Sequence, residues 1–129
     1  MKTPRAIGRP ALIALALAAF AGPAGAQETV SPAWQILAPP SAEWNIVYRL
    51  NRSSGEITGC AYIERAAGNV TTCYPAMDHA RGGDPGPYTL AASNNSTVIS
   101  VYRLNERTGE ISLCWVAGWK NTLCAPEDE

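Results

Sequence analysis

VYRLNRSSGEITGC, residues 47–60, recurs at residues 101–114 as VYRLNERTGEISLC. Nine of the fourteen positions are identical, at a constant offset of 54 residues. In each copy, two short strand-like runs surround an Asn-x-x-Ser/Thr-Gly segment. Asn caps such a turn through its side chain, and Gly supplies the positive φ at its end. The stretch therefore predicts a β-hairpin, and its recurrence predicts two related units.

The register of the hairpin assigns its side chains to two faces. A four-residue turn opposes Leu50 and Ile57, which brings apolar side chains together. One face is then largely apolar, and we expect it to form the core of both units: Trp44, Ile46, Tyr48, Leu50, Ile57 and Ile63 in the first, and Val98, Tyr102, Leu104, Ile111, Leu113 and Trp115 in the second. The other face carries Val47, Arg49, Thr58 and Cys60, and in the second unit Val101, Arg103, Ser112 and Cys114.

The repeat extends beyond the hairpin in both directions. At the same offset Trp34 aligns with Tyr88, so each unit begins with a short strand, and a fourth strand-like run follows each hairpin. The repeat units are residues 34–74 and 88–125. The segment between them, residues 75–87, is rich in Gly and Pro and is expected to be a linker or surface loop.

The predicted fold is all-β, with two tandem four-stranded antiparallel meander units. Each unit is apolar on one face and must bury it, so we expect a pseudo-twofold sandwich or barrel stapled by disulfides. The alternative is two propeller blades that assemble as an oligomer. We favour a monomer, because disulfides and long Arg side chains can cover an outer sheet face.

Residues 1–26 have the pattern of a secretory signal peptide. A basic start, an apolar run at residues 11–20 and a small-residue site ending at Ala26 predict cleavage before Gln27. The mature chain, residues 27–129, is then a single β domain that does not span a membrane. We expect it in the periplasm or the extracellular medium.

Charge and cysteine content narrow the partners and the chemistry. The mature chain keeps seven of the ten Lys and Arg and all 11 acidic residues, a net charge of about −4 that argues against a nucleic-acid partner.

Four cysteines in a short exported chain indicate two disulfides. The repeat favours local pairing, Cys60 with Cys73 and Cys114 with Cys124. A four-thiolate zinc site lacks the C-x2-C spacing.

Catalytic patterns are missing from the sequence. No Ser-His-Asp arrangement or Gly-rich phosphate loop occurs, and Glu56 and Glu110 have only a weak likeness to a glycosidase pair. The single histidine, His79, lies in the linker with Asp78 and Asp84, a pattern more typical of a solvated loop than of a metal site. We therefore expect no catalytic residue, metal or cofactor.

The candidate ligand-binding residues are polar or aromatic: Trp119, Lys120, Arg103 and Arg49. Trp119 and Lys120 lie at the tip of a predicted turn, where an exposed Trp suits contact with a sugar or a protein. The loop at residues 65–69 is expected to project beside them. Arg49 and Arg103 recur diagonally across the hairpin from Glu56 and Glu110, on the same face, which predicts cross-strand ion pairs or a duplicated polar site.

The repeat, Y-R-L-N-x-x-[ST]-G-E-I-x-x-C, resembles one found in small exported bacterial proteins that have no assigned activity, and the likeness covers both units. Residues 99–102, 109–111, 114–115 and 118–119 also look like a blade of the two-repeat fucose-binding lectins. In those lectins, two four-stranded blades per chain assemble as trimers into a six-bladed propeller. Ser100 replaces their sugar-binding Arg, and Gly59 and Leu113 replace their Glu. The likeness thus concerns the shape of the blade and not fucose binding.

These features together predict an exported, non-catalytic binding or cell-envelope-associated protein. Its ligand is not identified by the sequence, although a glycan or an envelope protein fits the exposed aromatic residue. The alternatives are a lectin-like carbohydrate-binding protein and an inhibitor of a cell-wall hydrolase, which needs only a protruding loop.

Overall fold

The computed structural model describes Gly25 and residues 32–128. The predicted signal peptide therefore lies outside the described residues, apart from Gly25, as do residues 27–31. The described chain forms eight strands and one short 3₁₀ helix: β1 (Trp34–Leu37), β2 (Ile46–Asn51), β3 (Ile57–Ile63), β4 (Val70–Tyr74), η1 (Asp78–Arg81), β5 (Tyr88–Ala92), β6 (Val101–Asn105), β7 (Ile111–Ala117) and β8 (Asn121–Ala125).

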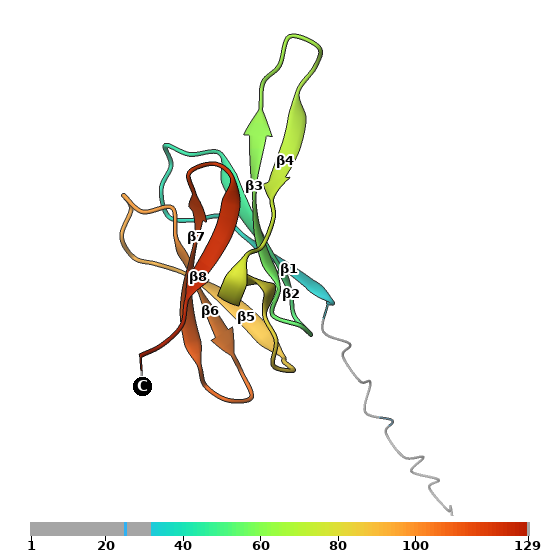
Figure 1. Ribbon diagram of the computed structural model, residues 1–129, viewed down its shortest axis with the longest axis vertical. Coiled ribbons are helices and arrows are strands. Elements are labelled where there is room, and N and C mark those ends of the chain that lie inside the picture. Colours follow the sequence, from blue (N-terminus) through green and yellow to red (C-terminus); the bar gives the residue numbers. More distant parts are fainter. Residues whose placement is uncertain (1–24, 26–31, 129) are drawn as a thin grey trace, which may run out of the picture.

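The strands form two four-stranded antiparallel meanders, β1-β2-β3-β4 and β5-β6-β7-β8, which we call sheet 1 and sheet 2 (Figure 1). The all-β prediction of two meander units packed against each other is confirmed. The predicted hairpin register is also correct, because Leu50 pairs with Ile57 and Leu104 with Ile111.

The hairpin turns form by the same local chemistry in both units. The Asn51 side chain accepts hydrogen bonds from the backbone N–H groups of Ser53 and Ser54, at 3.0 and 3.2 Å. Asn105 does the same for Arg107 and Thr108, at 3.0 and 3.3 Å. Each turn ends at a glycine with a φ near +80°. These contacts join residues close in sequence, which is why the turn was predictable.

The two sheets do not bury equivalent faces. We call the face that carries Tyr48 in sheet 1 and Tyr102 in sheet 2 the front face, and the face with the repeated Arg and Cys the back face. Sheet 1 buries its front face as expected, with Ile46, Tyr48, Leu50 and Ile57 in the core. Sheet 2 buries its back face instead, which includes Tyr88, Leu90, Val101, Arg103, Cys114 and Val116.

The core predicted for the second unit is therefore wrong. Tyr102 and Ile111, which match Tyr48 and Ile57, are 42% and 46% exposed, and the other predicted core positions there are only partly buried: Val98, Leu104, Leu113 and Trp115. In the first unit, Trp44 is exposed and Ile63 only partly buried. A pseudo-twofold relation would bury equivalent faces, so the sheets are instead stacked front onto back.

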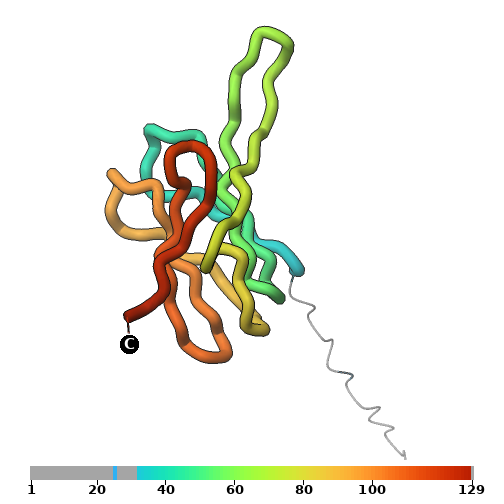
Figure 2. The backbone as a smooth tube through the Cα atoms, viewed as in Figure 1, coloured from blue at the N-terminus to red at the C-terminus, as the bar shows by residue number. Residues whose placement is uncertain are grey.

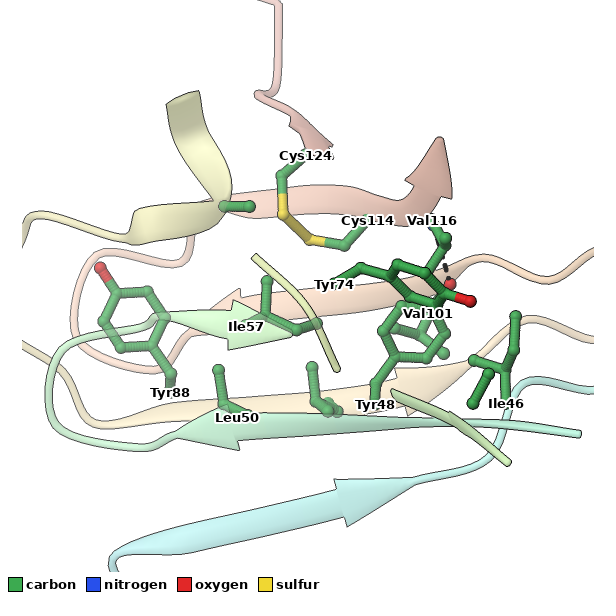
Figure 3. Packing of buried hydrophobic residues seen from close by; sticks show 13 residues of the cluster. Ile46, Tyr48, Leu50, Ile57, Tyr74, Tyr88, Val101, Cys114, Val116 and Cys124 are labelled. Atoms are coloured by element: carbon green, nitrogen blue, oxygen red, sulfur yellow. Dashed lines mark hydrogen bonds between the residues drawn. A yellow bond between two sulfur atoms is a disulfide. The ribbon is translucent and has the colours of Figure 1, made fainter. Parts of the chain in front are cut away.

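The wrong face was predicted for the second unit because both of its faces carry enough apolar area to form a core. Period-2 alternation sorts side chains into two faces but does not say which one is covered. The back face of sheet 2 includes a disulfide as well as its aliphatic residues. Figure 3 shows the Cys114–Cys124 bridge lying over the core beside Tyr74 and Val116.

Polar contacts fix how the sheets meet. The Tyr48 hydroxyl donates to the carbonyl of Ile99 at 2.5 Å and accepts from the N–H of Val116 at 3.2 Å. Gly59 donates its N–H to the Thr122 hydroxyl at 2.9 Å. A Cβ on Gly59 would lie 2.3 Å from a methyl carbon of Val116, so the sheets approach this closely only because position 59 is glycine.

The linker takes part in the fold to a greater extent than a surface loop does. The N–H of Thr122 donates to the carbonyl of Pro75 at 2.9 Å, and the N–H of Met77 donates to the carbonyl of Thr122 at 3.0 Å. Ala80, in η1, is fully buried in the core. The linker thus covers the free edge of β8, which would otherwise expose unpaired backbone groups.

The predicted local disulfides, Cys60–Cys73 and Cys114–Cys124, are both confirmed. Their surroundings differ, because Cys114 and Cys124 are both buried whereas Cys73 is exposed on the back face of sheet 1. The β3–β4 hairpin above Cys60–Cys73 projects well beyond the rest of the molecule (Figure 2).

Candidate functional site

Trp119 lies, as predicted, in the turn between β7 and β8. It adopts a φ of +56°, a left-handed conformation that bulky residues rarely take. Its ring packs against Trp44, with ring centroids 5.2 Å apart, and against the edge of Tyr74, at 6.0 Å. Such contacts hold the indole in one place, and unusual backbone conformations of this kind occur often at binding sites.

Trp119 is part of an open hollow of about 490 Å³, which we call the aromatic cleft. Its lining comes from three parts of the chain: the loop before β2, the loop before β6 and the β7–β8 hairpin. The lining residues are Trp44, Thr97, Val98, Ile99, Ser100, Leu113, Trp115, Val116 and Trp119. Trp44 and Trp119 are 45% and 46% exposed, so their rings are available to a ligand.

Sequence reasoning found one tryptophan of this cleft and missed two. Trp44 and Trp115 were assigned to the core from their alternation, but Trp44 precedes β2 and lies outside the regular strand. That position was the available signal, because alternation assigns a face only within a strand. Lys120, the neighbouring candidate, is exposed and does not line the cleft. The loop at residues 65–69 does not line it either, and lies at the tip of the β3–β4 hairpin (Figure 1).

A second, smaller hollow of about 140 Å³ lies over the back face of sheet 2, beneath the linker, and we call it the polar cleft. Arg103 is only 5% exposed there. It donates to the carbonyl of Gly55 at 2.6 Å and to the Ser112 hydroxyl at 3.2 Å, and its guanidinium lies 5.6 Å from the centre of the Tyr88 ring. Burial lowers the pKa of Arg103, while Tyr88 and Glu110 oppose that shift. The contacts with Gly55 and Ser112 give Arg103 a structural role between the sheets.

Arg49, the counterpart of Arg103, is not brought to the same site. It is exposed on the outer back face of sheet 1, with its guanidinium 5.2 Å from the centre of the Trp34 ring. Neither Arg forms the predicted ion pair with Glu56 or Glu110; in the described part of the chain, the ion pair is Arg52–Glu106, at 3.2 Å. The expected cross-strand pairs are therefore wrong.

The remaining polar candidates do not converge on one centre. Glu110 lines the polar cleft and Glu56 does not. His79 and Asp84 lie at the same cleft, but within residues 32–128 no three His, Cys, Asp or Glu side chains are grouped closely enough to hold a metal ion. The described residues include no helix with the length and hydropathy of a membrane span.

Comparisons with protein-family models, with curated proteins and with solved structures found no match to this chain.

Proposed function

We propose that this is an exported, non-catalytic binding protein whose aromatic cleft binds a carbohydrate. The observation that carries the proposal is that Trp44, from the loop before β2, meets Trp115 and Trp119 of the β7–β8 hairpin in one open hollow. Small-molecule sites are typically concave and aromatic, with a few polar groups that orient the ligand.

A sugar ring matches this lining in two respects. Its apolar C–H face can lie on an indole, whose π face is electron-rich. Its hydroxyls can reach the polar groups that Thr97 and Ser100 place among the apolar residues of the cleft. The packing of Trp119 on Trp44 and Tyr74 reduces the side-chain entropy that binding would otherwise cost.

A glycan-array screen of the mature domain, followed by titration calorimetry of the best ligand, tests the proposal. Trp119→Ala and Trp44→Ala should each weaken binding by about tenfold or more, the loss expected when a central aromatic contact is removed. Tyr62→Ala is the matched control, because Tyr62 is an exposed aromatic residue outside the aromatic cleft. Equal binding by all three variants would place the ligand elsewhere.

The second candidate, inhibition of a cell-wall hydrolase, is favoured by the projecting β3–β4 hairpin. Residues 64–71 are all exposed, and the Cys60–Cys73 bridge holds the strands together below them. Rigid protruding loops are well suited to enter an active-site groove. Replacing residues 65–68 with a tight turn should abolish inhibition of a cell-wall hydrolase while leaving glycan binding unchanged. Retained inhibition would exclude the hairpin.

A further inference from the structure

Front-onto-back packing leaves two unlike apolar faces on the outside of the molecule. On the front face of sheet 2, Tyr102 and Ile111 are exposed and line an apolar hollow of about 350 Å³ with Ala91 and Leu104. The back face of sheet 1 exposes three large apolar side chains: Trp34, Ile36 and Tyr62. Ile36 is 70% exposed, unusual for a β-branched aliphatic residue in a strand.

These two outer faces are repeat copies of the two faces that already pack together inside the chain. The exposed front face of sheet 2 carries Tyr102, Leu104 and Ile111, where the buried front face of sheet 1 carries Tyr48, Leu50 and Ile57. The exposed back face of sheet 1 carries Trp34 and Ile36, where the buried back face of sheet 2 carries Tyr88 and Leu90.

We propose that a second copy of this chain covers these faces, so that the front of sheet 2 in one molecule packs on the back of sheet 1 in the next. The contact between the two sheets of one molecule is the template. Because the paired surfaces are different, the contact is heterologous, and it can continue until a ring closes or a filament forms. The proposal does not depend on the carbohydrate site, and it replaces the monomer expected from sequence.

The polar contacts support the same geometry. Within the molecule, Arg103 donates across the sheets to the carbonyl of Gly55. Its repeat counterpart, Arg49, is exposed and lies over Trp34. In the proposed assembly, Arg49 donates to the carbonyl of Gly109 in the next copy, the repeat counterpart of Gly55.

The repeat copies diverge at the other end of the sheets. Gly59 fits closely against Val116 within the molecule. In the contact between copies, Leu113 takes the place of Gly59 and Tyr62 takes the place of Val116, because these are their repeat counterparts. Leu113 lies opposite Tyr102, whereas Ile111 lies opposite Leu104, so the contact between copies centres on the end that carries Leu104 and Ile111. Trp119 lies beyond the opposite end of β7 from Ile111, so this contact leaves the indole of the aromatic cleft accessible.

Two charge substitutions on exposed residues test the proposal without disturbing the core. Ile111→Arg blocks the front face of sheet 2, and Ile36→Arg blocks the back face of sheet 1. Light scattering and sedimentation should show an oligomer for the wild-type mature protein at micromolar to millimolar concentration, and a monomer for each variant alone. Mixing the two variants should restore a dimer with one copy of each, since one intact front face meets one intact back face. Val70→Arg, at an exposed apolar position of β4 outside both contact areas, should leave the oligomer unchanged.

A wild-type protein that stays monomeric over this range overturns the proposal. So does a result in which only Ile111→Arg or only Ile36→Arg disrupts the oligomer, because that pattern indicates contact between two like faces. Circular dichroism of each variant checks that the fold is retained. A second readout is reduction of Cys60–Cys73, which should slow as the wild-type protein is concentrated and should not slow in Ile36→Arg.

Discussion

Tyr48 and Tyr102 occupy the same position in the two repeats, yet Tyr48 is fully buried and Tyr102 is 42% exposed. The hydroxyl of Tyr48 bridges the Ile99 carbonyl and the Val116 N–H of the other sheet. Identical local sequence thus has two structural roles, depending on which face of its sheet is covered. The pair also provides matched variants, in which the same substitution tests a buried and an exposed site.

Removing the Tyr48 hydroxyl should destabilise the domain. Tyr48→Phe leaves the Ile99 carbonyl and the Val116 N–H without their partner, at a cost of about 1–3 kcal/mol for buried groups of this kind. Tyr102→Phe is the control and should change the free energy of unfolding by no more than about 0.5 kcal/mol. Urea denaturation of both variants measures the difference. Equal effects would contradict the bridging role.

Stability should fall in alkaline solution because of the same residue. Burial raises the pKa of Tyr48 from 10.0 to about 12. A raised pKa means that the folded state favours the neutral phenol. The contribution of Tyr48 to the free energy of unfolding is therefore complete below pH 10 and is lost as the pH rises toward 12. The loss amounts to about 2–3 kcal/mol, at 1.36 kcal/mol for each unit of pKa. Denaturation midpoints across this range should decrease more steeply for the wild type than for Tyr48→Phe; parallel slopes would contradict the assignment.

The two disulfides should differ in their reaction with reductants. Cys73 is exposed, whereas Cys114 and Cys124 lie in the core, so a mild thiol should open Cys60–Cys73 first. Thiol–disulfide exchange requires access to a sulfur atom. Alkylation followed by peptide mapping at intervals gives the order. Replacing either pair by serine should cost about 3 kcal/mol, from the length of the loop that each bridge closes. Prior opening of Cys114–Cys124 would show that the sheets separate readily.

Arg103 and Arg49 should respond differently to the same replacement. Lys cannot span the Gly55 carbonyl and the Ser112 hydroxyl as the planar guanidinium of Arg103 does. Arg103→Lys should therefore destabilise the domain by about 1–3 kcal/mol. Arg49→Lys, on an outer face, should change stability by at most about 0.5 kcal/mol when measured in dilute solution. Thermal unfolding of both variants makes the comparison, and similar losses would contradict a cross-sheet role for Arg103.

Gly59 should tolerate no side chain. Its Cβ would overlap a methyl group of Val116, so Gly59→Ala should cost about 1–3 kcal/mol through overpacking. Shortening the opposing residue as well, in Gly59→Ala/Val116→Ala, should cost less than the sum of the two single changes. Denaturation of the three variants tests this coupling. Additive losses would mean that the close contact does not limit the approach of the sheets.

Much of this fold is determined by the sequence alone, because the interactions that build it are local. The turns at Asn51 and Asn105 form through hydrogen bonds spanning two or three residues. The register follows from alternation, and each disulfide joins neighbouring strands of one meander. The repeat then predicts a second unit of the same kind. Each of these steps needs only residues close together along the chain or directly paired across a hairpin.

Only the tertiary structure decided which face of the second sheet is buried, and with it the two clefts. Both faces of that sheet can form a core, so the choice depends on what the first sheet and the linker present to it. The aromatic cleft joins Trp44 to Trp119, 75 positions apart, through a contact between units that no periodicity encodes. Local sequence specifies strands and turns, whereas the packing of one half-apolar sheet on another depends on the summed fit of both surfaces.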